Sequence, residues 1–68
     1  MKLSARNVFK GKVTDVKEGA VMAKVKVDIG GGNVVSSLVS LEAVKELDVK
    51  VGDDINILIK ATSVMLAK

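Results

Sequence analysis

A strict alternation of apolar and polar side chains over residues 20–29 constrains the fold more than any other feature of the sequence. One parity carries apolar side chains, namely Val21, Ala23, Val25, Val27 and Ile29. The other parity carries Met22, Lys24, Lys26 and Asp28. Successive side chains of a strand point to opposite faces of a sheet, so this period of two predicts a strand with one buried face and one solvated face.

A second strand is predicted before this one, over residues 8–16. Val13 and Val16 are out of step across Thr14 and Asp15, which indicates a β-bulge or a bend. Gly19, which follows Glu18, supplies the conformational freedom that a tight hairpin between the two strands needs.

The run Gly30-Gly31-Gly32-Asn33 is the strongest break in the sequence and predicts a second hairpin, leading into a third strand over residues 34–41. A glycine run can also cradle a phosphate. However, no Lys-Ser or Lys-Thr follows this one and no helix is predicted to begin there, so a Walker-type loop is not indicated.

The only helix candidate spans residues 40–47. Ser40 is the predicted N-cap, and Leu41, Val44 and Leu47 share one face. A turn at residues 51–54 then leads into a fourth strand, in which Ile55, Ile57 and Ile59 alternate with polar or solvent-facing residues. Residues 64–67 are predicted to form a fifth strand.

Five short strands with one short helix between the third and the fourth are typical of an all-β, OB-like, five-stranded Greek-key barrel. The 68 residues leave room for a single domain over residues 1–68. Domains of this size commonly need disulfides, metals or oligomerisation for stability. The chain has no Cys and no His, which excludes disulfides and the usual zinc, haem and iron–sulfur sites, so oligomerisation is expected.

The composition also bears on partners and location. Hydrophobic residues make up 49% of the chain, with Phe9 as the only aromatic, and this apolar set exceeds what one small barrel can bury. No apolar run approaches the roughly 20 residues that span a bilayer, and residues 1–4 do not begin a signal peptide. We therefore expect a cytoplasmic protein without a membrane partner.

Enzymatic activity is not expected. Without His or Cys the common acid–base and thiolate sites cannot be built, and only a Ser–Lys arrangement stays formally possible. The eight carboxylates are spread over turns and the helix, and Asp53-Asp54 lacks the alternate spacing of a calcium loop. No metal directly ligated by side chains is predicted.

Two kinds of binding stay open on the residues alone. OB barrels commonly bind single-stranded nucleic acid and the net charge is +3, but one aromatic residue cannot supply a row of stacking platforms. The alternative is a small oxyanion, since hydroxyls lie near isolated cations in residues 4–7 (Ser-Ala-Arg-Asn) and 60–63 (Lys-Ala-Thr-Ser). Each tetrapeptide by itself is a weak signal.

The sequence resembles the Mop domain family, the molybdate-binding domains of molbindins. The resemblance is carried by Ser4-Ala5-Arg6-Asn7 followed by Lys10-Gly11, by Ile59-Lys60-Ala61-Thr62, by residues 36–41 and by the approach to the fourth strand at residues 47–52. Several separated motifs in this order within one short chain are far more specific than any one of them.

The resemblance implies what the residues alone leave open. It implies a homohexamer, arranged as a trimer of dimers, that binds molybdate or tungstate between subunits and serves molybdenum storage and homeostasis, with no other cofactor and no nucleic acid. The implied oxyanion-binding residues are Ser4, Ala5 and Arg6 of one subunit and Lys60, Ala61 and Thr62 of a neighbour. A further class of site near the threefold axis is implied without assignable residues.

Overall fold

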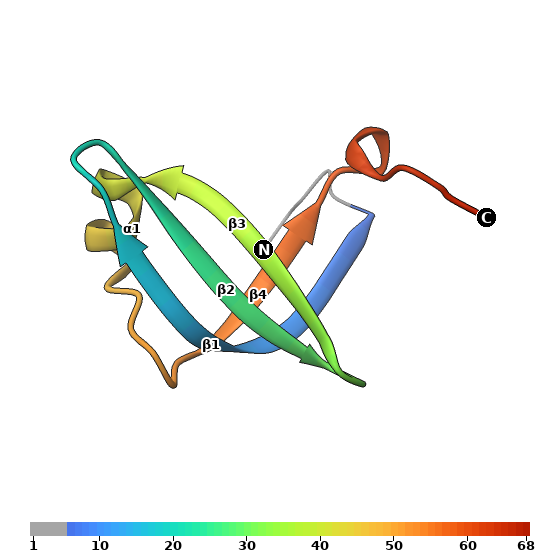
Figure 1. The fold of residues 1–68 in the computed structure, drawn as a ribbon, viewed down its shortest axis with the longest axis horizontal. Coiled ribbons are helices and arrows are strands. Elements are labelled where there is room, and N and C mark those ends of the chain that lie inside the picture. Colours follow the sequence, from blue (N-terminus) through green and yellow to red (C-terminus); the bar gives the residue numbers. More distant parts are fainter. Residues whose placement is uncertain (1–5) are drawn as a thin grey trace.

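A four-stranded antiparallel sheet forms the body of the protein in a computed structural model that describes residues 6–68 (Figure 1). The elements follow the chain as β1 (Asn7–Glu18), β2 (Met22–Gly30), β3 (Asn33–Ser40), the helix α1 (Leu41–Leu47), β4 (Asp54–Ile59) and the short 3₁₀ helix η1 (Ala61–Ser63). The strand order across the sheet is β3-β2-β1-β4, which makes β3 and β4 the two edges.

The long strand β1 belongs to both halves of the sheet. Its first half pairs with β4, from Asn7 opposite Ile59 to Lys12 opposite Asp54, and its second half pairs with β2 as far as Glu18. Between the two halves the strand turns sharply (Figure 1). The predicted bulge is confirmed, because the register with β2 shifts between Val13 and Asp15.

Gly11 lies where β1 passes from one partner to the other, and the backbone packing there leaves no room for a side chain. A Cβ atom on Gly11 would lie 2.5 Å from Cγ1 of Val27 and 2.7 Å from the carbonyl oxygen of Asp28. Because the second of these neighbours is main chain of the central strand β2, the clash cannot be relieved by rotating a side chain. The close approach of the two strands therefore depends on glycine at this position.

Both predicted local signals around β3 are confirmed. The glycine run forms the β2–β3 turn, in which Gly30, Gly31 and Gly32 all have positive φ. Asn33 donates from its side-chain amide to the carbonyl oxygen of Gly30 at 3.2 Å. At the other end of β3, the Ser40 hydroxyl accepts a hydrogen bond from the Ala43 N–H at 3.0 Å and so caps α1.

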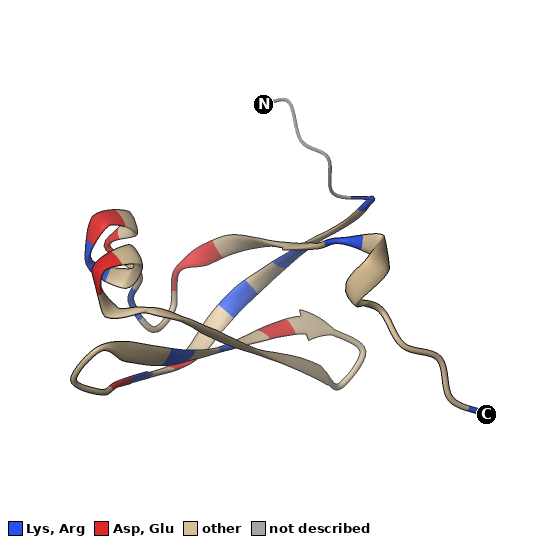
Figure 2. Cartoon of the chain, turned by 90° about the horizontal axis from the view of Figure 1, so that it is seen from above, with Lys and Arg blue, Asp and Glu red and all other residues tan. Residues whose placement is uncertain are grey.

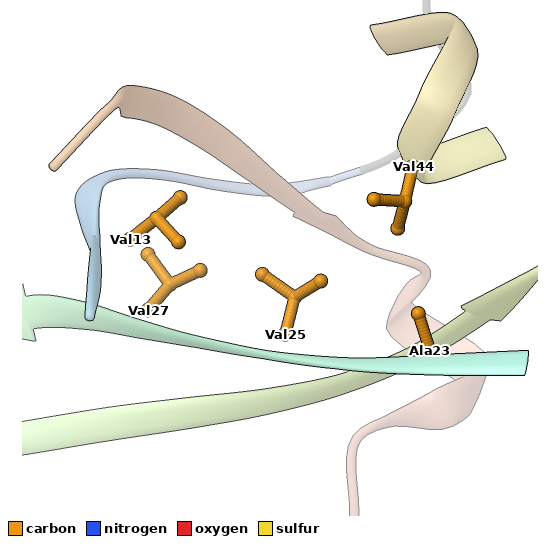
Figure 3. Close-up of a cluster of buried hydrophobic side chains, with 5 residues drawn as sticks. All are labelled: Val13, Ala23, Val25, Val27 and Val44. Carbon is orange, nitrogen blue, oxygen red and sulfur yellow. The ribbon is translucent and has the colours of Figure 1, made fainter. Parts of the chain in front are cut away.

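The buried core is small and consists almost entirely of valine. Figure 3 shows three residues of β2 and one of β1 pointing toward a side chain of α1. The fully buried residues are Val13, Ala23, Val25, Val27 and Val44. Three of them belong to the predicted core parity, whereas Val21 precedes β2 and is 73% exposed in the single chain. Phe9 is 40% exposed in the single chain, so its expected burial in an assembly stays a prediction.

The predicted fifth strand is wrong for this chain taken alone. Residues 64–68 pair with no strand among residues 6–68, and Val64 instead donates its N–H to the carbonyl oxygen of Ala61 at the end of η1. Met65 and Leu66 are 92% and 95% exposed. The apolar residues Val64 to Ala67 suit a strand in composition, but a strand also needs a neighbouring backbone, and η1 directs this segment away from both sheet edges (Figure 1).

The described part of the chain contains no helix that is long and apolar enough to cross a membrane.

Gly11→Ala should destabilise the protein, because the added methyl group must displace the β2 backbone. We expect a loss of about 1–3 kcal/mol in the free energy of unfolding, measured by urea denaturation at one fixed protein concentration. Ser36→Ala, an exposed position on β3, is the control and should leave the midpoint nearly unchanged. Equal midpoints for wild type and Gly11→Ala would contradict the close approach.

Candidate oxyanion-binding site

The start of β1 and the end of β4 lie side by side at one end of the sheet (Figure 1). Asn7, the first residue of β1, is paired with Ile59, the last residue of β4. Since the strands are antiparallel, the residue before Asn7 and the residue after Ile59 are at the same end. These residues are Arg6 and Lys60, so the pairing brings together two cations that are 54 positions apart in the sequence.

A side-chain hydrogen bond reinforces this end of the sheet. The Asn7 amide nitrogen Nδ2 donates to the carbonyl oxygen of Ile59 at 3.1 Å, and the pair is partly buried. Among the side-chain hydrogen bonds of residues 6–68, this one alone joins β1 to β4. It therefore ties together the segments that carry Arg6 and Lys60.

After Lys60 the chain folds into η1 and keeps several polar groups close to that cation. Lys60 is the N-cap of η1, and its carbonyl oxygen accepts a hydrogen bond from Ser63 N–H at 2.9 Å. This turn places Thr62 and Ser63, which both carry hydroxyls, directly after Lys60 in one short helical turn. Ala61 has no polar side chain and can contribute only its backbone N–H to a ligand.

The charge distribution around this end favours an anion. Figure 2 shows Lys and Arg near the start of β1 and the end of β4, while the acidic residues lie on α1 and on strand segments further away. The two ion pairs within residues 6–68 are Lys12 with Asp54 at 3.6 Å and Lys50 with Asp48 at 3.2 Å. Neither involves Arg6 or Lys60, so both cations keep their donors for a ligand.

Four of the six predicted site residues fall in the described chain, and the fold gathers all four at this end. Arg6, Lys60, Ala61 and Thr62 are all exposed, which suits a site that a second subunit could complete. The other two, residues 4 and 5, lie outside the described residues. Asn7 is part of the sequence motif, but its contact could not be predicted from the sequence, because its bond to a residue 52 positions away forms only in the folded chain.

A cavity in the described chain is of a different kind. It has a volume of about 180 Å³ and lies between β4 on one side and β2, β3 and α1 on the other. Its lining is mainly apolar, with Ser37 and Asn56 as the polar exceptions. An oxyanion would lose its hydration there without gaining donors, so this cavity is unsuited to it. Residues 6–68 also contain no cluster of three or more acidic, His or Cys side chains that could hold a metal ion.

Comparison with known sequences identifies the family. The model of the TOBE domain matches residues 3–66. The chain is 61% identical over 66 residues to a probable molybdenum-pterin-binding protein of Haemophilus influenzae, covering 97% of this chain and 96% of that protein. It is 47% identical to molybdenum-pterin-binding protein 1 of Clostridium pasteurianum, with 97% of each chain covered.

Solved structures share the fold along the whole chain. MopII from Clostridium pasteurianum superposes with a TM-score of 0.92 at 45% identity and covers 98% of this chain and 100% of its own. A molybdate-binding protein from Sporomusa ovata gives a TM-score of 0.94 at 34% identity, with both chains fully covered. The cytoplasmic molybdate-binding protein ModG, solved with molybdate bound, gives 0.85 at 43% identity over 90% of this chain and 43% of its own.

The Mop-domain resemblance noted in the sequence is thereby confirmed. A family model that spans nearly all residues, relatives of matching length and superposable structures point to one group. The chain belongs to the TOBE-domain family and, within it, to the molbindins.

Proposed function

We propose that this protein binds molybdate, and also tungstate, at the end of the sheet formed by the start of β1 and the end of β4. The single observation that carries the proposal is the Asn7–Ile59 pairing, which places Arg6 and Lys60 at the same end of the sheet. Within residues 6–68, neither cation forms an ion pair with a carboxylate. The molybdate-binding proteins among its structural neighbours support the choice of ligand.

The chemistry of these residues suits a tetrahedral dianion. Arg6 offers a planar fork of donors, Lys60 a mobile ammonium group, and Thr62 a hydroxyl that can rotate toward an anion oxygen. Charge-assisted hydrogen bonds of this type are shorter and stronger than neutral ones. Ser4 and Ala5, which precede Arg6 directly, belong to the proposed site through a hydroxyl and a backbone N–H.

We further propose that the site is completed between subunits of a homohexamer built as a trimer of dimers. The support is the number of large apolar side chains that residues 6–68 of a single chain leave exposed, because apolar patches on a surface commonly mark contacts with another subunit. The most exposed large apolar side chains are Val21, Leu38, Leu47, Val51, Met65 and Leu66. In such an assembly the sheet ends of two subunits lie next to each other, so that Arg6 of one subunit and Lys60 of its neighbour approach the same anion. Each subunit then contributes its Arg6 to one site and its Lys60 to another, although both cations lie at the same end of its sheet.

The proposed role is storage and buffering of molybdenum in the cytoplasm by binding rather than by catalysis. Binding of single-stranded nucleic acid is not favoured, because Phe9 is the only aromatic residue of the chain and base stacking needs several. A pterin ligand is not proposed either, since the cavity between β3 and β4 offers few polar partners for its ring.

Lys60→Ala should weaken molybdate binding about tenfold to hundredfold in titration calorimetry, because it removes one charge-assisted contact. Lys24→Ala, which removes an exposed lysine from β2, is the matched control and should bind like the wild type. Molybdate should raise the thermal midpoint of the wild type and of the control, and much less that of Lys60→Ala. Wild-type affinity in Lys60→Ala would refute the site.

A mixing experiment tests the two-subunit arrangement. Arg6→Ala subunits keep Lys60, and Lys60→Ala subunits keep Arg6. If the two cations of a site come from different chains, hexamers reassembled from both variants would contain some sites with both cations intact. The mixture should then regain part of the high-affinity binding that each variant lacks. If both cations of a site come from one chain, mixing restores nothing.

Analytical ultracentrifugation should give a mass six times the 7.1 kDa of the chain, because burial of the exposed apolar side chains requires sister subunits. Molybdate should stabilise the hexamer further, since a ligand held between subunits links binding to assembly. A stable monomer at micromolar concentration would contradict intersubunit sites.

Molybdate and tungstate should bind more tightly than sulfate or phosphate in competition calorimetry. A pocket of hydroxyls, amides and few cations fits the larger dianions, and it lacks the charged carboxylate acceptor that would favour the proton of hydrogen phosphate. Equal affinity for sulfate would refute the explanation by size.

A further inference from the structure

The side chain of Asn7 makes a contact that its neighbours in the sequence do not predict. It begins β1, is half-buried, and donates from its side chain to the carbonyl oxygen of Ile59 at 3.1 Å. It is bonded covalently to Arg6, while Ile59 is bonded covalently to Lys60. This hydrogen bond therefore joins Asn7, which follows Arg6, to Ile59, which precedes Lys60.

Because of the geometry of the peptide group, this hydrogen bond also restricts the backbone from which the Lys60 side chain projects. The carbonyl group of Ile59 and the nitrogen and Cα atoms of Lys60 lie in one plane, because the peptide bond is planar. A donor bonded to the Ile59 oxygen therefore limits the rotation of this peptide group. Because the peptide group includes the Cα atom of Lys60, the donor also limits the direction of the Lys60 side chain. On the opposite strand, the Asn7 backbone sets the direction in which Arg6 leaves the sheet.

Apart from the backbone ladder between β1 and β4, the described residues provide little that holds these two ends together. The Asn7–Ile59 pair is the terminal pair of the β1–β4 ladder within residues 6–68, and terminal pairs fray more easily than internal ones. The next pair inward, Val8 with Leu58, carries only apolar side chains that are 50% and 40% exposed. Without the amide, the strand ends would gain freedom, and the anion would have to restrict it on binding.

We propose that Asn7 is a positioning residue of the oxyanion site. Through the Ile59 carbonyl it holds the ends of β1 and β4 in register, so that Arg6 and Lys60 are presented in a binding-competent arrangement before the anion arrives. This inference rests on the proposed function, since it concerns the same site.

The test compares Asn7→Ala with Asn33→Ala. Asn33 makes a bond of the same type, from its amide to the Gly30 carbonyl oxygen at 3.2 Å, but it does so in the β2–β3 turn. Molybdate affinity should fall about threefold to tenfold in Asn7→Ala and stay at the wild-type value in Asn33→Ala. Ultracentrifugation and the ligand-free thermal midpoint confirm that both variants are folded and assembled. Should Asn7→Ala fail to fold, Asn7→Leu, which has similar size and no donor, takes its place.

A double-mutant cycle separates positioning from a general loss of stability. If Asn7 acts by orienting Lys60, its substitution should cost much less affinity in a Lys60→Ala background than in the wild type. A loss of the same size in both backgrounds, or no loss in the wild type, would overturn the inference. Absence of molybdate binding by the wild type would instead refute the proposed function, so the two failures are distinguishable.

Discussion

The shared strand β1 is the constraint on which the rest of the structure depends. One backbone serves two different partners, β4 along its first half and β2 along its second, and it must bend between them. Gly11 permits the bend by omitting the side chain that would collide with β2, and the bulge after Val13 restores the alternation of faces. As a result of the bulge, Val13 is buried in the valine core and Val16 packs against it, although the two residues are three positions apart in the strand.

The candidate site follows directly from this arrangement. Because β1 and β4 are antiparallel, the beginning of one and the end of the other meet at the same end of the sheet. The cations are attached to a regular ladder, which positions side chains more precisely than mobile loops do. Neutral donors from η1 supplement them, and the acidic residues lie on other parts of the fold (Figure 2).

The small size of the core explains why the proposed site and the proposed assembly belong together. The five buried apolar residues within residues 6–68 are few for a folded domain, and the large apolar side chains exposed in the same part of the chain outnumber them. Sister subunits that cover this surface would supply the missing burial and would also bring a second set of cations toward each sheet end. Stability and ligand binding would then depend on the same contacts between subunits.

Local patterns in the sequence determined the strands over residues 20–29 and 55–59, the bulge near Thr14, the Ser40 cap and the glycine turn, because each depends on neighbours within a few positions. The motifs around Arg6 and Lys60 identified the family, and four of the residues predicted from them are gathered at one end of the sheet. Only the tertiary structure decided that residues 64–67 lack a strand partner within the chain and that Asn7 bonds to the Ile59 carbonyl. Both outcomes depend on which backbones lie side by side after folding, and a one-dimensional pattern of apolar and polar residues does not contain that information.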